Sequence, residues 1–365
     1  MNTIHVLTAH ETKSELYLFP LRFHKKRLKR AGLDFKYYHR FRPETLEADW
    51  VIVDCRWAFE RFGSRNDEMF DFLRAAGKSC RNLAWLDTTA STTVAYPDVL
   101  PFVDLYFKGL LLKDRRKYLK PFYSNRIFAD YYFRTLGVRD SREPRSLIVS
   151  SESHLPKLRV LWNYSLAGHI GSRSRMFYYL RRFVPIPSFY SIPFASPERP
   201  RQIDVSCRLN LDYPQRESVS FQRREMVRLL EARFAPPKER ISRTQYHREM
   251  REAKIVPSPF GWGEINYRDF EVLASGAALM KPDMDHLETW PDLYRKDETY
   301  ISHHWNLSDV AGQIRRYLET GRYLTIARQA QDLYRKRLFQ EDGREEFCVR
   351  ALRLFKDDDM GLRER

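Results

Sequence analysis

Residues Lys254 to Met280 read KIVPSPFGWGEINYRDFEVLASGAALM, and this stretch decides the fold. The run Lys254 to Val256 is short and apolar, and a loop with two glycines follows it. Glu264 to Ser275 suits a helix closed by Gly276, and Ala277 to Met280 is a second apolar strand. A strand, a loop, a helix and another strand in this order predict a βαβ unit of an α/β fold.

The glycine loop of this unit has the chemistry of an anion site. Free backbone N–H groups and the positive end of a helix dipole can hold a diphosphate, and glycines allow its close approach. We therefore take Ser258, Gly261 and Gly263 as candidate binding residues. In the expected helix Glu264 and Glu271 share one face, and Arg268 lies between them. An ordinary loop followed by a Glu–Arg–Glu ladder gives the same spacing, so the local pattern leaves both interpretations open.

The rest of the 365-residue chain repeats this alternation, and its length suits two domains. Five prolines between Phe183 and Pro200 interrupt regular structure and predict a linker. We predict two Rossmann-like α/β domains that face each other across a cleft. Their expected bounds are an N-terminal domain over 1–190, a linker over 191–202, a second domain over 203–340, and a C-terminal helix over 341–365 that can pack back on the first domain. The N-terminal domain is expected to hold strands at 4–8, 34–38, 50–54, 83–87 and 103–107, with helices at 16–31 and 68–76.

Positive charge is the strongest global feature of the chain. It has 64 Lys and Arg against 48 Asp and Glu, a net charge of +16. Two clusters, Arg22 to Arg42 and Lys108 to Lys120, interleave basic and aromatic side chains. They indicate either solvated faces with aromatic anchors or a surface that meets anionic lipid headgroups. A nucleic-acid partner is not expected, because no helix-turn-helix, RNA-recognition or zinc-finger signature appears.

Other sequence features narrow the class of protein. No apolar run approaches the ~20 residues that span a bilayer, and the N-terminus lacks the pattern of a secretory signal. The four cysteines lie far apart without a CxxC pair, which excludes a disulfide scaffold and makes the cytoplasm the expected location. The pair His303-His304 has no partner at metal spacing, so no metal is expected.

Three segments of the second half together resemble the donor-binding segment of GT-B glycosyltransferases. They are the run Ser258 to Glu264, the motif Tyr267 to Glu271, and the small-residue stretch Leu273 to Pro282. The pattern is most similar to that of a bacterial, group 1-like set with an exostosin-like or spore-maturation-type C-terminal domain. In that set a glycine-rich loop, R-x-x-E and a helix ending in glycine precede an apolar strand that ends in proline. The resemblance covers Ile203 to Lys336, while the first half matches by architecture.

This resemblance implies a metal-independent enzyme that needs no cofactor. A nucleotide-sugar donor would bind the second domain, and its sugar would pass to a hydroxyl held by the first. The resemblance and the basic surface together suggest that the acceptor is a glycan or a lipid-linked sugar, as in surface polysaccharide or lipopolysaccharide assembly. The expected location is then the inner face of the membrane. The rival interpretations are a basic nucleic-acid-binding protein without catalysis and an inactive GT-B scaffold.

One departure from the family pattern concerns the paired glutamates. The large retaining group has seven residues between them, whereas six separate Glu264 from Glu271. On a helix, one residue turns a side chain by about 100°. The spacing therefore favours an inverting reaction over a retaining one. If the reaction were retaining, Glu264 would be the candidate catalytic carboxylate.

An inverting transfer needs a base, and the ends of parallel strands are where such groups gather. Asp87 fits best, because it closes a predicted strand, and His10 and Asp54 follow two other strands. The alternative for each carboxylate is a helix or turn cap.

Cations or a helix N-terminus must stabilise the departing diphosphate. Arg208 follows the first strand of the second domain, and Arg268 lies on the donor helix, so both are candidates. His286 follows the next strand and can touch the sugar or the ribose. The alternative for any one arginine is a surface ion pair worth ~0–1 kcal/mol.

Overall fold

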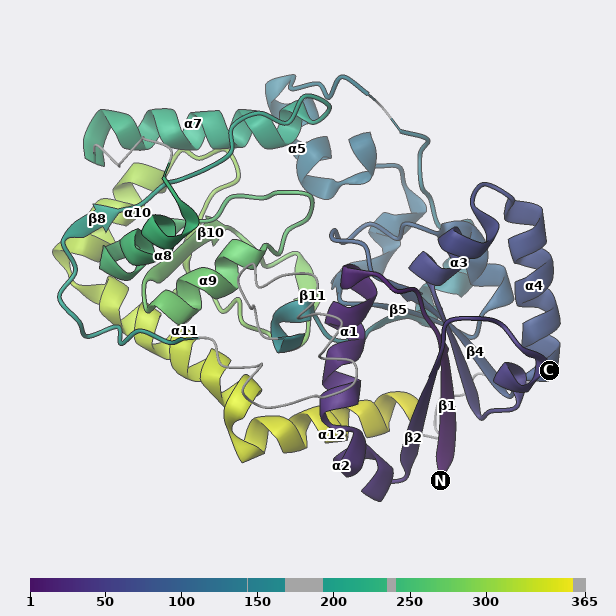
Figure 1. Cartoon of the computed structure of the whole chain (residues 1–365). Coiled ribbons are helices and arrows are strands. Elements are labelled where there is room, and N and C mark those ends of the chain that lie inside the picture. Colours follow the sequence, from purple (N-terminus) through teal and green to yellow (C-terminus); the bar gives the residue numbers. More distant parts are fainter. Residues whose placement is uncertain (143, 168–192, 235–240, 357–365) are drawn as a thin grey trace.

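The computed structural model describes residues 1–142, 144–167, 193–234 and 241–356. Its chain forms two α/β domains, each built around a parallel sheet, and helices cover the sheets (Figure 1). The predicted fold class of two Rossmann-like domains is thereby confirmed. The described residues do not include 143 and 168–190 of the expected N-terminal domain, 191–192 of the expected linker, 235–240 of the expected second domain or 357–365 of the C-terminal segment.

The first sheet has the strand order β2-β1-β3-β4-β5-β7, and all neighbours are parallel. Its central strands are buried on both faces, which explains their continuous apolar runs. The strand order reverses between β1 and β3, so their carboxyl ends form the switch point of the sheet. The strands are β1 (Asn2–Leu7), β2 (Leu33–Tyr38), β3 (Trp50–Asp54), β4 (Asn82–Asp87), β5 (Leu105–Lys108) and β7 (Leu158–Val160).

Two helices of this domain differ from their expected bounds. The single helix expected over 16–31 is two helices that meet at His24, where φ is −92° and ψ is 11°. The helix expected to stop before Gly77 continues to Ser79, because one glycine costs a helix only about 1 kcal/mol. The helices are α1 (Thr12–Phe23), α2 (Lys25–Arg30), α3 (Cys55–Phe62), α4 (Asn66–Ser79) and α5 (Ile127–Leu136). Short 3₁₀ helices are η1 (Pro43–Leu46), η2 (Pro97–Phe102), η3 (Arg115–Leu119), η4 (Tyr123–Asn125), η5 (Glu152–Lys157) and η6 (Tyr164–Ala167).

The second sheet has the order β12-β10-β9-β8 and is also parallel. An apolar core from its strands and helices includes Ile255, Met280 and Ile314. The strands are β8 (Ile203–Val205), β9 (Ala253–Pro257), β10 (Ala278–Pro282) and β12 (Ile301–His303). The helices are α7 (Glu217–Phe234), α8 (Arg243–Glu252), α9 (Tyr267–Ser275), α10 (Val310–Glu319) and α11 (Arg322–Phe339).

Helix α9 begins three residues later than the sequence pattern predicts. Asn266 has extended backbone angles, φ −124° and ψ 155°, and its N–H donates to the Asp269 carboxylate at 3.1 Å. This contact caps the helix, so Glu264 belongs to the loop before it. The prediction that Glu264 and Glu271 share one helical face is therefore wrong.

Two elements connect the domains. Strands β6 (Leu110–Leu112) and β11 (Leu287–Thr289) pair antiparallel, one from each half of the chain. Helix α12 (Glu341–Phe355) lies against the first domain, and its Phe355 ring meets those of Phe35 and Phe107 with centroids 5.5 Å apart. Figure 1 shows α12 continuing from α11 and passing beneath α1. No helix in the described ranges is long and apolar enough to cross a membrane.

Candidate functional site

The loops that follow β4 and β9 meet between the two domains. Glu264 is fully buried, and its carboxylate accepts from the Thr92 N–H at 3.1 Å and from the Thr92 hydroxyl at 2.7 Å. A Cβ added to Gly263 would lie 1.7 Å from the carbonyl oxygen of Ala90. Only glycine allows this approach of two backbones. The structure therefore places Gly263 and Glu264 in a domain contact.

Ser258 lies in a buried polar network behind this loop. Its hydroxyl donates to Asp269 at 2.6 Å, and the Lys281 ammonium pairs with the same carboxylate at 3.1 Å. Burial lowers the pKa of Lys281, although Asp269 opposes the shift. Gly261 faces the side chain of Asn266, which would stand 2.5 Å from an added Cβ. These contacts fix the conformation of the glycine loop.

The predicted diphosphate ligands have different surroundings. Arg208 makes a bidentate ion pair with Glu249, with N···O distances of 2.6 and 2.9 Å, so a protein carboxylate already balances its charge. Arg268 donates through Nη2 to the Arg208 carbonyl and lies 5.6 Å from the centre of the Tyr246 ring. No carboxylate of the described chain pairs with Arg268. Of the two arginines, Arg268 is the one with an unbalanced charge.

The structure also brings in Arg223 of α7, which the sequence analysis missed. Its side chain is buried, and it donates to the Asn210 carbonyl at 3.1 Å and the Tyr213 hydroxyl at 2.9 Å. Burial lowers the pKa of Arg223, and the positive charge of Arg268 lowers it further. Two cations thus lie within electrostatic range of each other near the glycine loop. No motif marks Arg223, because arginine on an amphipathic helix is ordinarily solvent-exposed.

Four buried nitrogen atoms on three side chains at the carboxyl edge of the second sheet have no hydrogen-bond partner in the described chain. They are Nη1 of Arg268, both ring nitrogens of His286 and Nε2 of His303. The three side chains come from the ends of different strands: Arg268 follows β9, His286 follows β10 and His303 ends β12. Burial lowers the pKa of His286 and lowers that of His303 to about 4, so both rings are neutral at pH 7. Unsatisfied buried polar groups cost free energy, so this edge has the properties of a ligand site.

Glu271 lies in α9 and contacts two residues of α8. It accepts from the Tyr246 hydroxyl at 3.3 Å, and Arg243 stands 3.8 Å from it. It has partners within its own domain and is separated from Glu264 by the cap of α9.

Asp87 is fully buried at the end of β4. Its carboxylate accepts from Lys108 Nζ at 2.9 Å, from the Tyr106 hydroxyl at 2.7 Å and from the Thr89 N–H at 2.8 Å. Burial opposes its charge, but Lys108 and Tyr106 outweigh that effect and hold the pKa of Asp87 below its ordinary value. These are the surroundings of a carboxylate that orders a loop. They do not suit a base that must meet an acceptor hydroxyl.

The other two base candidates lie at the switch point of the first sheet. Asp54 is fully buried, caps α3 by accepting from the Arg56 N–H, and accepts from the Thr8 hydroxyl at 3.0 Å. His10 is exposed and stacks on His39 with ring centroids 3.6 Å apart. Of the three candidates, His10 is the one that a substrate can reach.

Metal-ligand geometry is absent from the described ranges. No group of three or more His, Cys, Asp or Glu side chains gathers there as metal ligands would.

Comparison with known proteins finds distant likenesses to solved structures. No protein-family model matches the sequence, and no curated protein does. The chain is similar to HepE of Anabaena, solved in complex with UDP-glucose, at 11% identity over 96% of this chain and 99% of that one, with a TM-score of 0.40. It is similar to the sucrose-phosphate synthase of Thermosynechococcus elongatus at 10% identity over 97% and 98%, TM-score 0.43. A glycosyltransferase of Rickettsia africae gives 8% identity over 97% and 98%, TM-score 0.42. At these scores the likenesses identify no family for the chain.

Proposed function

We propose that the chain is a glycosyltransferase whose nucleotide-sugar donor binds at the carboxyl edge of the second sheet. The observation that carries the proposal is the set of unpartnered buried groups there: Arg268 Nη1, the His286 ring and His303 Nε2. A nucleoside diphosphate offers acceptor oxygens to a guanidinium, and its ribose or sugar hydroxyls can pair with neutral imidazoles. The donor-segment motif Tyr267 to Glu271 supports the same assignment.

The remaining roles follow from exposure and charge. Arg268 faces the diphosphate and stabilises the negative charge that develops as it leaves. His10, exposed at the switch point of the first sheet, accepts the proton of the attacking hydroxyl in an inverting transfer that requires no metal. Glu264 keeps the two loops together through Thr92 instead of acting on the sugar.

The acceptor is a glycan or a lipid-linked sugar at the cytoplasmic face of a membrane, within surface polysaccharide or lipopolysaccharide assembly. The support for this part is the basic surface of α2, where Lys25, Lys26 and Arg30 are exposed. Each such charge contributes about 1 kcal/mol of attraction near an anionic bilayer.

The donor assignment is tested by thermal unfolding with a panel of nucleoside mono- and diphosphates. A nucleotide at ~100 times its dissociation constant should stabilise the fold by ~2.7 kcal/mol. Single-stranded DNA and RNA form the second arm. A shift with nucleic acid and none with any nucleotide favours a nucleic-acid-binding protein instead.

The Arg268→Ala variant locates the nucleotide. Loss of a charge-assisted contact should weaken binding by about tenfold to a hundredfold. The matched control is Arg315→Ala, which removes an exposed arginine of α10 and should leave the affinity unchanged. Unchanged affinity in folded Arg268→Ala removes this arginine from the site.

A further inference from the structure

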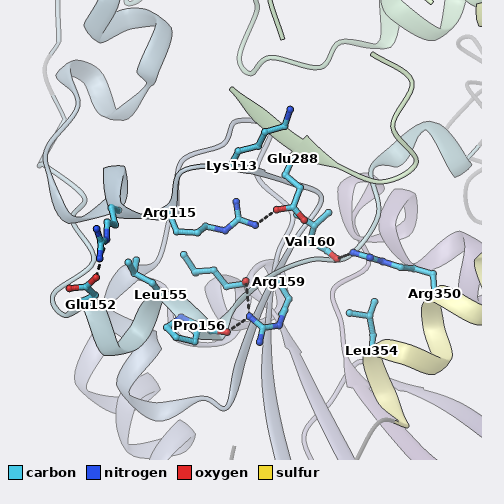
Figure 2. Close-up of a pocket in the computed structure, with 12 residues that line it drawn as sticks. Lys113, Arg115, Glu152, Leu155, Pro156, Arg159, Val160, Glu288, Arg350 and Leu354 are labelled. Carbon is cyan, nitrogen blue, oxygen red and sulfur yellow. Dashed lines mark hydrogen bonds and ion pairs between the residues drawn. The ribbon is translucent and has the colours of Figure 1, made fainter. Parts of the chain in front are cut away.

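A pocket of about 580 Å³ lies between the first domain, β11 and α12. Five basic side chains line it, and they come from the position after β6, from η3, from strand β7 and from helix α12. These side chains are Lys113, Arg115, Arg116, Arg159 and Arg350. Figure 2 shows four of them around the pocket: Lys113, Arg115, Arg159 and Arg350. The pocket shares none of its lining residues with the proposed donor edge.

The charges that line this pocket do not cancel. Arg115 pairs with Glu288 of β11, and Arg116 Nε stands 3.1 Å from Glu152. These two carboxylates are the acids among the described lining residues. Five cations and two carboxylates leave a net charge of +3 in one pocket.

Two of the arginines are held in place without a counter-ion. Arg159 donates to the Pro156 carbonyl, and Arg350 donates to the carbonyls of Val160 and Leu161. Neither has a carboxylate partner in the described ranges, and burial lowers the pKa of both. For Arg159, the nearby positive charge of Arg115 adds to this shift. Backbone carbonyls orient a guanidinium but leave its charge unbalanced, so an anion in the pocket would be strongly stabilised.

Arg115 provides a second, independent observation that points to a ligand in this pocket. While one nitrogen of its guanidinium contacts Glu288, its Nη1 is buried and has no hydrogen-bond partner among the residues described. In Figure 2 Arg115 and Arg159 reach into the middle of the pocket from two sides. An anion bound between them would satisfy this donor.

The remaining lining residues are apolar and define the rest of the ligand. Figure 2 shows Leu155 and Pro156 on one side of Arg159 and Leu354 on the other, below Arg350. Leu158 and Val160 of β7 complete this apolar wall. The volume falls in the ~300–1,000 Å³ range of small-molecule sites. Guanidinium groups match the geometry of phosphate oxygens. The chemistry thus calls for a phosphate joined to an apolar body.

We propose that this pocket binds a phosphate group carried by an apolar moiety. The phosphate lies among Arg115, Arg159 and Arg350, with Lys113 at the rim, and the apolar part covers the wall formed by β7 and α12. A lipid headgroup and a soluble phosphoester share this chemistry. The site is separate from the donor edge, so this proposal does not depend on whether a nucleotide binds there.

Binding of monomeric dodecyl phosphate to the full chain, followed by titration calorimetry, tests the site. One molecule should bind per chain, and inorganic phosphate should compete weakly. Lys113→Glu reverses a charge at the exposed rim and should weaken binding by about tenfold, as should Arg159→Gln, which removes a central cation. Lys120→Glu is the matched control: it makes the same charge change at an exposed lysine of the same basic run outside the pocket, and it should change affinity by less than about twofold.

Vesicles of phosphatidylcholine with a minority of phosphatidic acid distinguish the two sources. If pocket variants weaken vesicle and dodecyl phosphate binding in parallel, the ligand is a lipid headgroup. If they weaken only dodecyl phosphate binding, it is a soluble phosphoester. The proposal is overturned if dodecyl phosphate fails to bind, if folded Lys113→Glu and Arg159→Gln bind it like the wild type, or if Lys120→Glu weakens binding as much as Lys113→Glu.

Discussion

Two fully buried lysine–aspartate pairs fix the carboxyl ends of the two sheets. Lys108 and Asp87 are 2.9 Å apart in the first domain, and Lys281 and Asp269 are 3.1 Å apart in the second. In each pair the carboxylate also accepts from a tyrosine hydroxyl, at 2.7 and 2.8 Å. Removing one partner leaves a buried charge without compensation, which costs more than the intact pair contributes. These aspartates therefore order the loops that carry the site.

Asp87→Asn should destabilise the protein, because it removes the carboxylate partner of Lys108 in a site with no exposure. We expect the free energy of unfolding to fall by about 3–5 kcal/mol, measured by urea denaturation at pH 7. Asp332→Asn, at an exposed position of α11, is the control and should stay within about 0.5 kcal/mol of the wild type. The double variant Asp87→Asn/Lys108→Met should regain part of the loss. Wild-type stability with lost turnover would instead return Asp87 to the role of a base.

His10→Gln should lower turnover by ~10²–10⁴, the usual contribution of a positioned base. Because His10 is exposed and belongs to the first domain, nucleotide affinity and stability should hardly change. His154→Gln removes a half-buried histidine of η5 and serves as the control in the same assay. Normal turnover in His10→Gln would show that the base is another group.

At the scale of elements, regular periodicity was enough to predict much of the fold. The strands and helix of the βαβ unit at 254–280 follow from apolar runs and a closing glycine, and both strands lie within one or two residues of their expected bounds. The start of α9 was missed because Asn266 and Asp269 form a local cap, and that contact overrides the helical pattern of Glu264 and Ile265. Boundaries depend on such single contacts, whereas element type depends on many residues.

The site was harder to predict, because its contacts join residues far apart in the sequence. Arg208 finds its counter-ion Glu249 across 41 positions, and Glu264 finds Thr92 across 172. A strand end marks where functional groups gather, but it does not say which of them is buried and paired. Asp87 and His10 both follow strands, and only the three-dimensional structure distinguishes their surroundings.

The junction of α1 and α2 carries a pH dependence. His24 lies there, stacked on Phe347 of α12 with centroids 4.8 Å apart, and burial together with Arg344 and Arg27 lowers its pKa to about 3. Below the ordinary histidine pKa of ~6.5, His24 binds a proton in the unfolded chain but stays neutral in the folded chain. This ring therefore costs stability as the pH falls from about 6.5 toward 3, by about 1.4 kcal/mol per pH unit.

His24→Phe keeps an aromatic ring against Phe347 and removes the titrating group. Between pH 6 and pH 4 the variant should lose less stability than the wild type, and the two slopes should differ by about 1.4 kcal/mol per pH unit. Guanidinium denaturation at several pH values measures both slopes. Equal slopes would mean that His24 takes up its proton in the folded protein as well.

For the whole molecule, several contacts set how the domains are joined. Glu264 and Thr92 connect the loops at the carboxyl edges, β6 pairs with β11, and α12 returns to the first sheet. Arg201, at the end of the linker, donates to the carbonyls of Ala253 and Ser275 at 2.8 and 2.9 Å. The loop contact joins the glycine loop after β9 to the loop after β4, so it bears directly on the proposed donor site.

Gly263→Ala tests this loop contact. The new Cβ would lie 1.7 Å from the Ala90 carbonyl oxygen and 2.3 Å from its carbon, both backbone atoms that cannot swing away, so the loops must separate. We expect the free energy of unfolding to fall by about 1–3 kcal/mol. Amide hydrogen exchange should accelerate at 88–93 and 258–266, because the Glu264–Thr92 bonds open with the loops.

Gly312→Ala is the control for this substitution. Gly312 lies within α10, and an added Cβ there would meet nothing within 4 Å. Its replacement should be neutral or stabilise the helix by up to about 1 kcal/mol, with no change in exchange at the two loops. If Gly263→Ala behaves like Gly312→Ala, the loops have room to move apart and back without cost. The two loops would then adopt several relative positions of similar free energy. A ligand could reach the groups at the carboxyl edge without breaking the contact between Glu264 and Thr92.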